Sequence, residues 1–567
     1  DAIRDPVTGA IECRDPNARA NGCVPYDPFT TSAPNPAAIS YIDNEANGPR
    51  ESGQIARQFM RQEAFSFNLN GAPVDDWAGK VTIAAGFDYR EEAFAQQADP
   101  YAGGITPSTP ANANQPCTDP SIDCVASGPN HVNPGNWNAG NYTSGQGNYH
   151  VWETYVEAGI PLLNSDAFGK LDADIAGRFE RYSTAGDTTT WKVGLTWDTP
   201  LPGIRLRALQ SRDVRAPNLA DLFLPPQTLN GSFNNDFLLQ ATGNASGANQ
   251  QVGQTNAGNP LLQPEKGQTT NMGVVFQPDW LPGFQTSFDY YRIAVKGIIS
   301  ASGVQTVEDL CYQGFSQYCS QQFIPTANGQ PQTTTIGNTG DKGDHNQVLA
   351  IVAVPFNSAG LLTDGFDIES AYAFDLNDWN VPGNFTLRSL VNHTMKFLSD
   401  PGVPGQYTTE RAGAYLNGGF NSDTYSANTG NVATWKFTES QDWQGDTWGF
   451  NLQERYLAGG VLNGKWTSAN NPLGLANGTP GLHYLSCNPG SCPAPTLQMP
   501  TINDQKVPSV LYLDIGGTYN WSDKTQLYFH IDNIANQNPP NTGSNEANNT
   551  LYDVLGRMYR VGIRFNN

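Results

Sequence analysis

Eight cysteines offer the clearest chemistry in this sequence, and they fall into four close pairs. The pairs are Cys13–Cys23, Cys117–Cys124, Cys311–Cys319 and Cys487–Cys492. Short loops cost the least conformational entropy to close, so bonding within each pair is favoured over the other possible connectivities. A zinc site is the alternative, but it needs a CxxC spacing or accompanying histidines, and neither occurs. We therefore predict four disulfide bonds, formed in an oxidising compartment.

The six histidines form no recognisable catalytic or metal-binding pattern. The chain also has no G-x-S-x-G turn and no glycine-rich phosphate loop in a strand–turn–helix context. His530 and Asp532 would share one face of a strand, and we interpret them as a hydrogen-bonded pair rather than an acid–base dyad. Residues 341–346 depart from the spacing of an EF-hand and are interpreted as a loop. We therefore predict no enzyme activity, no metal site and no cofactor.

Long polar segments carry the residues that could bind a ligand. They are rich in Asn, Gln, Gly, Ser and Pro, and they cover residues 95–148, 216–265, 297–345, 398–430 and 459–506. No Lys or Arg occurs in 91–169 or 216–265, although a site for an anionic chelate is expected to present such charges. Amides and stacking rings instead suit a neutral, hydroxyl-rich ligand such as an oligosaccharide. The candidate aromatic contacts are Trp137, Tyr142, Phe223, Phe233, Phe237 and Trp466. The alternative is that these segments are simply solvated.

The composition limits the class of protein that can hold such segments. The 567 residues include 31 Lys and Arg against 53 Asp and Glu, so the net charge is −22. Such an acidic chain is a poor candidate for nucleic-acid binding. Charged residues make up only 15% of the chain, aromatic residues reach 11%, and no apolar run is long enough for a transmembrane helix. A single large β structure fits these values.

Alternation of apolar and polar residues is the dominant local pattern. Residues 80–90, for example, place Val81, Ile83 and Phe87 on one face and Asp88 and Arg90 on the other. We predict about fifteen strands, near 55–70, 80–92, 149–160, 171–182, 189–198, 203–213, 267–277, 283–295, 365–376, 384–397, 431–441, 447–457, 508–520, 525–534 and 553–565. Alternating segments of about ten residues are typical of a transmembrane antiparallel β-barrel, although a soluble sandwich would also alternate. In a barrel, Asp172, Asp174, Arg178 and Glu180 would form a charged network on the lumenal wall.

The connections between these strands favour the barrel. Short turns with an adjacent tryptophan recur, as in Asp76–Gly79, Asp279–Gly283 and Asp378–Gly383. A tryptophan at so many tight turns suggests an interfacial aromatic girdle, although coincidental turn composition is the alternative. The opposite strand ends are joined by the long polar segments. Short turns at one end and long loops at the other are typical of bacterial outer-membrane barrels.

Three segments together resemble a known family, the TonB-dependent outer-membrane receptors. Arg215-Ala216-Pro217-Asn218 is similar to the Arg-Ala-Pro-Asn segment of that family, and Asn259-Pro260-Leu261-Leu262-Gln263-Pro264-Glu265 is similar to its Asn-Pro-x-Leu-x-Pro-Glu segment. The end of the chain, 552–565, resembles the last strand of the family, although two further residues follow Phe565. We expect Arg215 to pair with an acid such as Asp213 or Asp221, or to contact ligand or plug.

The resemblance implies a 22-stranded barrel, of which residues 55–567 would supply about fifteen strands behind a polar, extracellular-type segment at 1–54. The family also has an N-terminal plug domain and a TonB-contacting segment, and we find neither in this sequence. The implied function is active import of a scarce solute across the bacterial cell outer membrane with TonB-derived energy. The implied partners are outer-membrane lipid and lipopolysaccharide, the TonB complex through the plug, and a small-molecule or oligosaccharide ligand.

Four other functions are the alternatives. One is a ferric-siderophore receptor of the same family. A passive porin or lipopolysaccharide-assembly barrel would lack the two family segments, and a barrel protease or lipase would need a catalytic constellation that we cannot assemble. A soluble secreted β protein would not depend on detergent.

Overall fold

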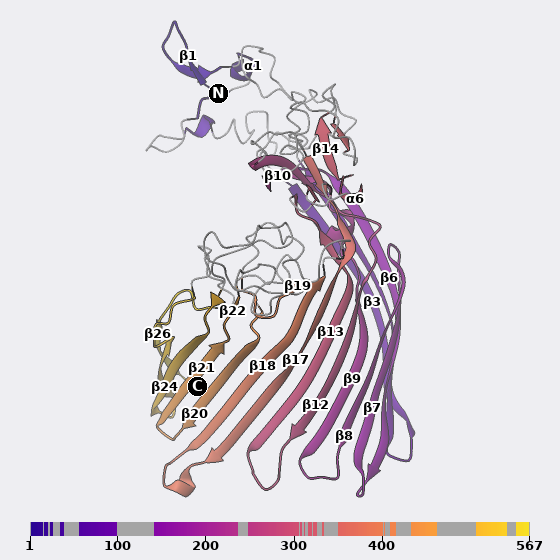
Figure 1. Cartoon of the computed structure of the whole chain (residues 1–567), viewed down its shortest axis with the longest axis vertical. Coiled ribbons are helices and arrows are strands. Elements are labelled where there is room, and N and C mark those ends of the chain that lie inside the picture. The colour runs from indigo at the N-terminus through magenta and orange to yellow at the C-terminus, as the bar shows by residue number, and fades with distance from the viewer. Residues whose placement is uncertain are drawn as a thin grey trace, which may run out of the picture.

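A curved antiparallel sheet makes up most of the computed structural model of this chain (Figure 1). The structure describes residues 2–14, 16–20, 23–26, 35–38, 56–98, 141–235, 248–304, 350–400, 432–461, 506–540 and 552–565, with short pieces between 307 and 333 and between 402 and 415. In this described part, no helix is long and apolar enough to cross a membrane.

Fifteen strands follow one another across the sheet. They are β3 (Ala56–Asp75), β4 (Lys80–Ala98), β6 (Gly145–Ser165), β7 (Gly169–Tyr182), β8 (Gly186–Asp198), β9 (Ile204–Arg215), β12 (Glu265–Phe276), β13 (Phe284–Ala301), β17 (Pro355–Asp375), β18 (Asn384–Asp400), β20 (Trp435–Gln444), β21 (Trp448–Leu457), β24 (Val510–Ser522), β25 (Thr525–Asp532) and β26 (Met558–Phe565). Every one overlaps a strand predicted from alternation, so the all-β fold and the number of visible strands are confirmed. The two-residue β19 (Thr409–Glu410) adds to the end of β18.

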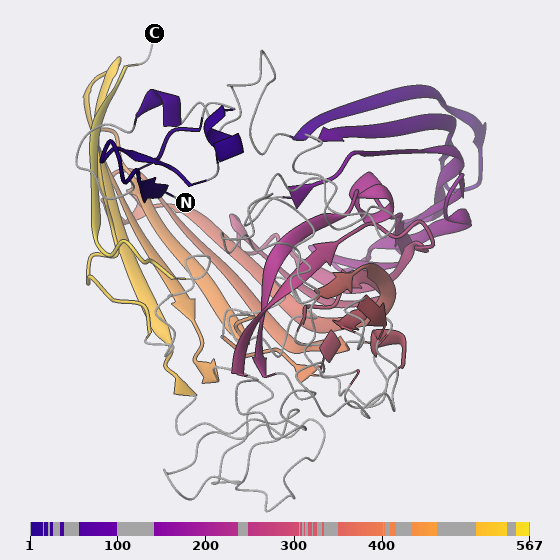
Figure 2. The same cartoon turned by 90° about the horizontal axis from the view of Figure 1, so that it is seen from above.

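The sheet bends into a wall with two edges (Figure 2). Among the described residues, β3 pairs only with β4 and β26 pairs only with β25. The predicted total of 22 strands therefore stays a prediction. Strand β17 begins ten residues earlier than predicted, because Pro355–Asp364 pair with the extended end of β13.

The strand register separates two faces of the wall, since directly opposite residues share a face. One row runs Thr196, Arg207, Gly273, Asp289 and Asp367 across five strands. An open cavity of about 1010 Å³ lies along this face, and its lining includes Arg207, Asp289 and Asp367. We call this polar, concave side the inward face.

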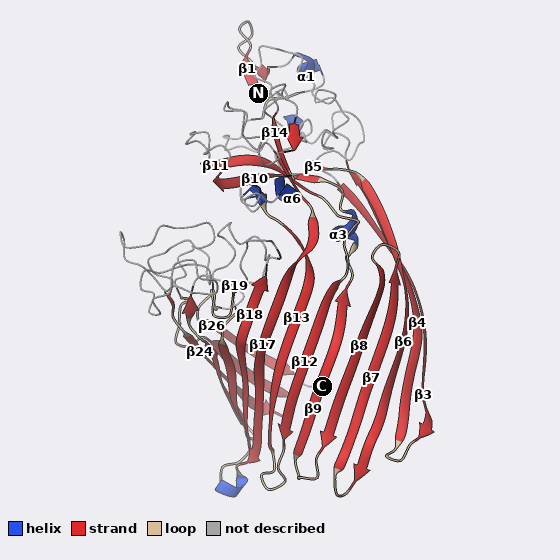
Figure 3. Ribbon diagram, turned by 45° about the vertical axis from the view of Figure 1, so that its right-hand side comes forward, coloured by secondary structure: helices blue, strands red, loops and turns tan. Residues whose placement is uncertain are grey.

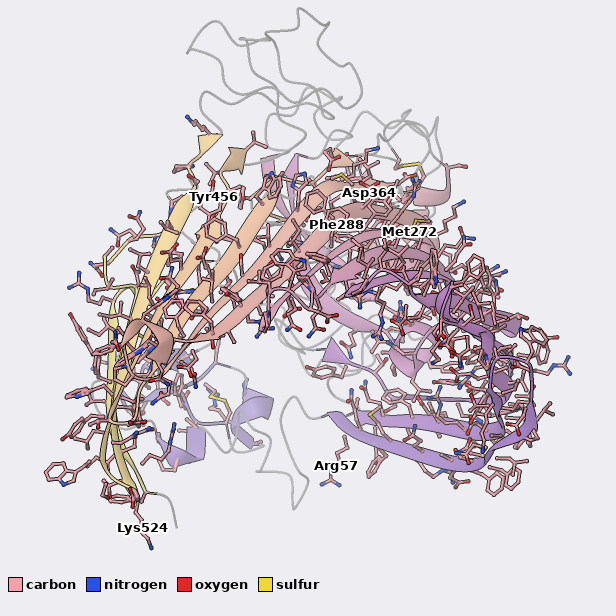
Figure 4. All side chains as sticks on the ribbon, turned by 90° about the horizontal axis from the view of Figure 1, so that it is seen from below. Arg57, Met272, Phe288, Asp364, Tyr456 and Lys524 are labelled. Atoms are coloured by element: carbon pink, nitrogen blue, oxygen red, sulfur yellow. A yellow bond between two sulfur atoms is a disulfide. The ribbon has the colours of Figure 1, made fainter. Side chains whose placement is uncertain are left out.

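The next row belongs to the opposite, convex side, which we call the outward face. It runs Ala208, Met272, Tyr290, Phe366 and His393. Figure 4 shows side chains projecting from both sides of the curved sheet. Polar residues inward and apolar residues outward is the arrangement of a transmembrane barrel.

Tight turns close the lower ends of the strands. Gly169 and Gly203 have φ values of 75° and 78°, a backbone conformation that favours glycine. Tryptophans near these turns project into solvent or membrane, with Trp77, Trp280 and Trp521 between 70% and 82% exposed. Trp379, in the 3₁₀ turn η4 (Asn377–Trp379), is exposed as well. These positions agree with a girdle at the short-turn end.

A second, smaller sheet lies above the upper end of the wall (Figure 3). We call it the crown. Its order is β15 (Pro331–Thr333), β14 (Gln322–Pro325), β16 (Ala350–Ala353), β11 (Ala248–Asn256), β10 (Gln227–Asn235) and β5 (Asn141–Tyr142). The crown thus gathers pieces of three of the long polar segments, which alternation alone did not predict as strands.

Two of the four predicted disulfides are confirmed. Cys13–Cys23 links the hairpin of β1 (Ala2–Arg4) and β2 (Ile11–Cys13) to the chain beyond α1 (Pro16–Ala20). Cys311–Cys319 closes the segment that ends in α6 (Ser316–Cys319). The pairs Cys117–Cys124 and Cys487–Cys492 lie outside the described residues. A further short ladder joins β22 (Gly460–Val461) to β23 (Lys506–Val507).

Candidate functional site

Arg215 stands at the upper end of β9 and joins two carboxylates. Its Nη1 lies 3.1 Å from Asp221 Oδ2, and its Nη2 lies 2.7 Å from Glu265 Oε1. The predicted pairing with Asp221 is therefore confirmed. Asp213, the other acid named, accepts a 2.7 Å hydrogen bond from Ser211 Oγ instead.

Glu265 is the buried partner of this network, with 8% of its surface exposed. Its Oε1 also accepts a 2.8 Å hydrogen bond from the backbone N–H of Ile299. A buried carboxylate is stable only when its charge is satisfied, and Glu265 receives a cation from β9 and an amide from β13. The residue therefore ties three adjacent strands together at their upper ends.

Asn218 begins the short helix α3 (Leu219–Phe223), which follows β9. Its Oδ1 accepts from the backbone N–H of Asp221 at 2.7 Å, and Asp221 Oδ2 accepts from the Asn218 N–H at 3.0 Å. This reciprocal capping box starts the helix directly after the buried Pro217. Asp221 thus serves both the helix start and Arg215.

Asn259 connects the second family segment to the first. Its Nδ2 donates to the Pro355 carbonyl at 2.9 Å, and its backbone N–H donates to the Asp221 carbonyl at 2.8 Å. The following Pro260 is exposed, whereas Pro264 is buried beside Glu265. The seven residues of the two family segments that we singled out therefore form one rim cluster: Arg215, Pro217, Asn218, Asn259, Pro260, Pro264 and Glu265.

An apolar core lies beneath the rim cluster. Leu219, Leu222 and Leu262 are at most 5% exposed and pack with residues of β4, β6 and β7, which are Phe94, Tyr149, Val151 and Tyr182. Gly147 is required in this core, since an added Cβ would lie 2.1 Å from the Phe223 ring. The rim cluster is therefore anchored to strands on both sides of β9.

The six predicted ligand contacts are only partly within the described residues. Phe223 is half-buried against Gly147, and Tyr142 lies in β5 opposite Gln227 of β10. Phe233 lies in β10 opposite Gln250, but its side chain is outside the described part. Trp137, Phe237 and Trp466 lie outside the described residues altogether. Their role as ligand contacts stays a prediction.

Ion pairs run along the inward face of β6, β7 and β8. Arg178 Nη1 lies 2.7 Å from Glu153, and Lys192 Nζ lies 2.6 Å from Asp174 and 3.1 Å from Glu157. The predicted inward network is confirmed for Asp174 and Arg178. It is also confirmed for Asp172, which pairs with Lys170. Glu180 also faces inward, opposite Glu153, but it is buried and accepts a hydrogen bond from the Tyr182 hydroxyl.

Further inward arginines were not identified from the sequence. Arg207 pairs with Asp289 through two hydrogen bonds, and Arg388 pairs with Glu369. Alternation shows that such residues share a face, but it does not say which acid each one meets. Arg207 and Asp289 are 82 positions apart, and only the strand order joins them.

Arg455 anchors a second cluster at the upper end of β21 and β24. Its guanidinium contacts Asp514, which is 2% exposed, and Asp553. It also lies 5.2 Å from the centre of the Tyr512 ring. Burial raises the pKa of the neighbouring Tyr552 to about 12, so this phenol stays neutral. The predicted His530–Asp532 pair is confirmed at 3.1 Å, and Asp532 also pairs with Arg560.

The described residues show no cluster of three or more His, Cys, Asp or Glu side chains suited to hold a metal ion. What the geometry offers is a polar inward wall, an apolar outward face and an anchored rim of loops. These features suit passage and capture of a solute.

Comparison with known proteins identifies the family. The model of the family described as TonB dependent receptor-like, beta-barrel, matches residues 14–534. No curated protein sequence matches the chain.

Solved structures show the same fold at low sequence identity. The siderophore receptor PirA from Acinetobacter baumannii superposes with a TM-score of 0.50 and 14% identity over 89% of this chain and 55% of that one. A double mutant of the ferric enterobactin receptor PfeA from Pseudomonas aeruginosa gives a TM-score of 0.52 and 14% identity over 90% of this chain and 54% of that one. A PfeA mutant in complex with enterobactin gives a TM-score of 0.51 and 14% identity over 91% of this chain and 56% of that one.

This chain spans about 55% of the length of those receptors. The family model covers nearly all of the chain, including the rim cluster and all but the last of the fifteen strands. The chain therefore belongs to the family of TonB-dependent receptor-like β-barrels.

Proposed function

We propose that this protein is an outer-membrane receptor that captures a scarce solute outside the cell and imports it with energy from the TonB complex. Members of the family are outer-membrane transport receptors of Gram-negative bacteria. Coupling to TonB would require the plug domain that the family resemblance implies. The observation that carries the proposal is the rim cluster, because Arg215 and Asn259 fix the described chain that connects the crown strands to the top of a polar-lined wall.

We further propose that the ligand is neutral and rich in hydroxyl groups, such as a glycan or glycoside. The inward arginines that could attract an anion are occupied: Arg178, Arg207 and Arg388 each contact a carboxylate. The segments 91–169 and 216–265 add no Lys or Arg. Amide-rich loops with stacking rings suit hydroxyl groups and sugar faces better than a charged chelate.

A ferric-siderophore ligand is the second candidate. The solved structures above are named as siderophore or ferric enterobactin receptors, and this favours the alternative. Near the upper ends of the described strands, Lys436 is a cation that could serve such a ligand, because it faces inward opposite Asn392 without a carboxylate within 4 Å.

Titration calorimetry would separate the two ligands. The protein purified from outer membranes in neutral detergent is titrated with a panel of neutral oligosaccharides and with ferric catecholate and hydroxamate chelates. We expect heat only from oligosaccharides, and no change in their affinity for Lys436→Gln. Binding of ferric chelates alone, weakened in Lys436→Gln, would establish the second candidate instead. Binding by neither group would contradict both ligand assignments.

A further inference from the structure

Four cations gather on the outward face at the upper ends of three adjacent strands. They are Arg212 of β9, Lys266 of β12, and Arg292 and Lys296 of β13, and we call them the basic patch. The register places Lys266 directly opposite Lys296, and Arg212 directly opposite Gln268. Arg292 lies opposite Thr270. All four therefore point away from the lumen.

The basic patch contains no compensating acid of its own. No carboxylate lies within 4 Å of its four side chains in the described part of the chain. Lys266, Arg292 and Lys296 are exposed and Arg212 is half-buried. Like charges directly opposite each other across a strand pair destabilise the sheet, so the Lys266–Lys296 pair would be relieved by a bound anion.

The neighbouring strands β17, β18 and β19 carry both acidic and basic side chains. Asp364 of β17 lies opposite Arg292 and is 5% exposed, while Lys396 of β18 lies opposite Asp364. Asp400 and Glu410 lie further along, and their carboxylates accept backbone N–H groups. The outward positions of β9, β12 and β13 themselves carry Gln210, Gln268 and Thr270 between the cations, which can donate further hydrogen bonds.

The apolar band below the basic patch indicates where the patch lies along the membrane normal. On β13 the outward residues Phe284, Phe288 and Tyr290 are aromatic, and Arg292 follows on the same face. Arg292 is eight residues beyond Phe284, which for a strand tilted by about 40° is roughly 20 Å along the membrane normal. The apolar band of an outer-membrane barrel is about 25 Å tall. The basic patch therefore lies where the hydrocarbon ends and the headgroups begin.

We propose that the basic patch binds the phosphate groups of a phosphorylated lipid in the outer leaflet. The inference rests on the proposed function for its orientation, with short turns on the periplasmic side. Unpaired Lys and Arg next to Gln side chains suit phosphate oxygens, which accept several charge-assisted hydrogen bonds. The position above an aromatic row favours a lipid over a soluble anion, because acyl chains can cover Met272 and Phe288 below.

Lipid binding to the purified protein tests this proposal. The full chain, extracted in neutral detergent, is titrated with diphosphoryl lipid A, and bound lipid is counted by native mass spectrometry. The test variants are Lys266→Gln/Lys296→Gln and Arg212→Gln/Arg292→Gln. Arg181→Gln is the matched control, because Arg181 is also an outward arginine near the upper end but already pairs with Asp187. Each lost charge should weaken binding roughly fivefold, so each double variant should bind roughly 25-fold more weakly.

Three results would overturn the proposal: unchanged affinity in both double variants, equal binding of dephosphorylated lipid A, or complete displacement of the lipid by inorganic phosphate. The second pair of substitutions guards against misfolding of the first, and heat-modified migration on gels checks that each barrel is folded. Solute binding measured on the same variants should stay unchanged. Loss of lipid binding with normal solute binding supports the patch, whereas lipid binding without any solute binding would contradict the proposed function alone.

Discussion

Lys192 on the inward face contacts two carboxylates, whereas Lys266 on the outward face lies opposite another lysine. The two residues come from the same wall, and β9 is the only strand between theirs. The inward cations Arg178, Lys192 and Arg207 of β7, β8 and β9 each lie within 4 Å of a carboxylate on a nearby strand. The outward cations Arg212, Lys266 and Lys296 lie opposite amides, apolar residues and each other, and among the described residues only Arg292 lies opposite an acid, Asp364 of β17. The difference is that these inward charges are satisfied within the protein, whereas the basic patch is suited to a partner outside it.

The largest expected effect is at the inward cluster of Arg455. Replacement of Arg455 by Gln leaves Asp514, only 2% exposed, without its cation. We expect a loss of about 3 kcal/mol in the free energy of unfolding, because an unpaired buried charge is costly. Urea unfolding in neutral detergent, followed by tryptophan fluorescence, measures it. A loss no larger than that of the exposed control Arg181→Gln would show that the inward pairs are not the source of stability.

The second largest effect on the free energy of unfolding is expected at the rim cluster. Arg215→Gln removes the cation that pairs with Glu265, but Arg215 itself is half exposed, so water replaces part of the interaction. We expect a loss of about 2 kcal/mol in the free energy of unfolding. The double change Arg215→Gln/Glu265→Gln should recover part of this loss, because it removes the buried charge. If the double variant is as unstable as the sum of two single changes, the pair is not coupled.

A smaller effect is expected at Lys192, whose side chain is 38% exposed. Lys192→Gln should lower the free energy of unfolding by about 1 kcal/mol, since its partners Asp174 and Glu157 remain hydrated in the lumen. The loss should shrink in high salt, where exposed charges are screened. A salt-independent loss would point to packing of the lysine stem instead.

At the basic patch we expect the free energy of unfolding to change in the opposite direction. Lys266→Gln removes a like charge from the position opposite Lys296, so in lipid-free neutral detergent we expect a gain of about 0.5 kcal/mol. The same variant should lose that advantage when diphosphoryl lipid A is added. The measurement is the urea midpoint with and without the lipid. A loss of stability in the absence of lipid would remove the distinction between the two faces.

Much of the fold was predictable because it depends on local alternation. Segments such as 171–182 place polar and apolar residues on opposite faces, and β7 has these faces where predicted. The crown was not predictable, since the strands β10 and β11 carry mostly Gln, Asn and Gly and show no apolar alternation. The extension of β17 was missed for a similar reason: Pro355 and the residues after it pair only because β13 lies alongside.

The candidate site was predictable in part. The two family segments were identified by their residues, and the pairing of Arg215 with Asp221 lies within six positions. The pairing of Arg215 with Glu265 spans 50 positions and needed the strand order. The basic patch was invisible in the sequence, because Arg212, Lys266 and Arg292 are isolated cations in an acidic chain.

The sequence by itself determined which residues alternate, where the chain turns, that Cys13 pairs with Cys23 and Cys311 with Cys319, and which family the chain resembles. These properties arise from neighbours within about ten positions, where backbone geometry and loop closure dominate. Only the tertiary structure decided which charges on strands far apart in the sequence face one another. Strand register places Arg207 against Asp289 and Lys266 against Lys296, and whether a charge is satisfied depends on that register and on the solvent that the face meets.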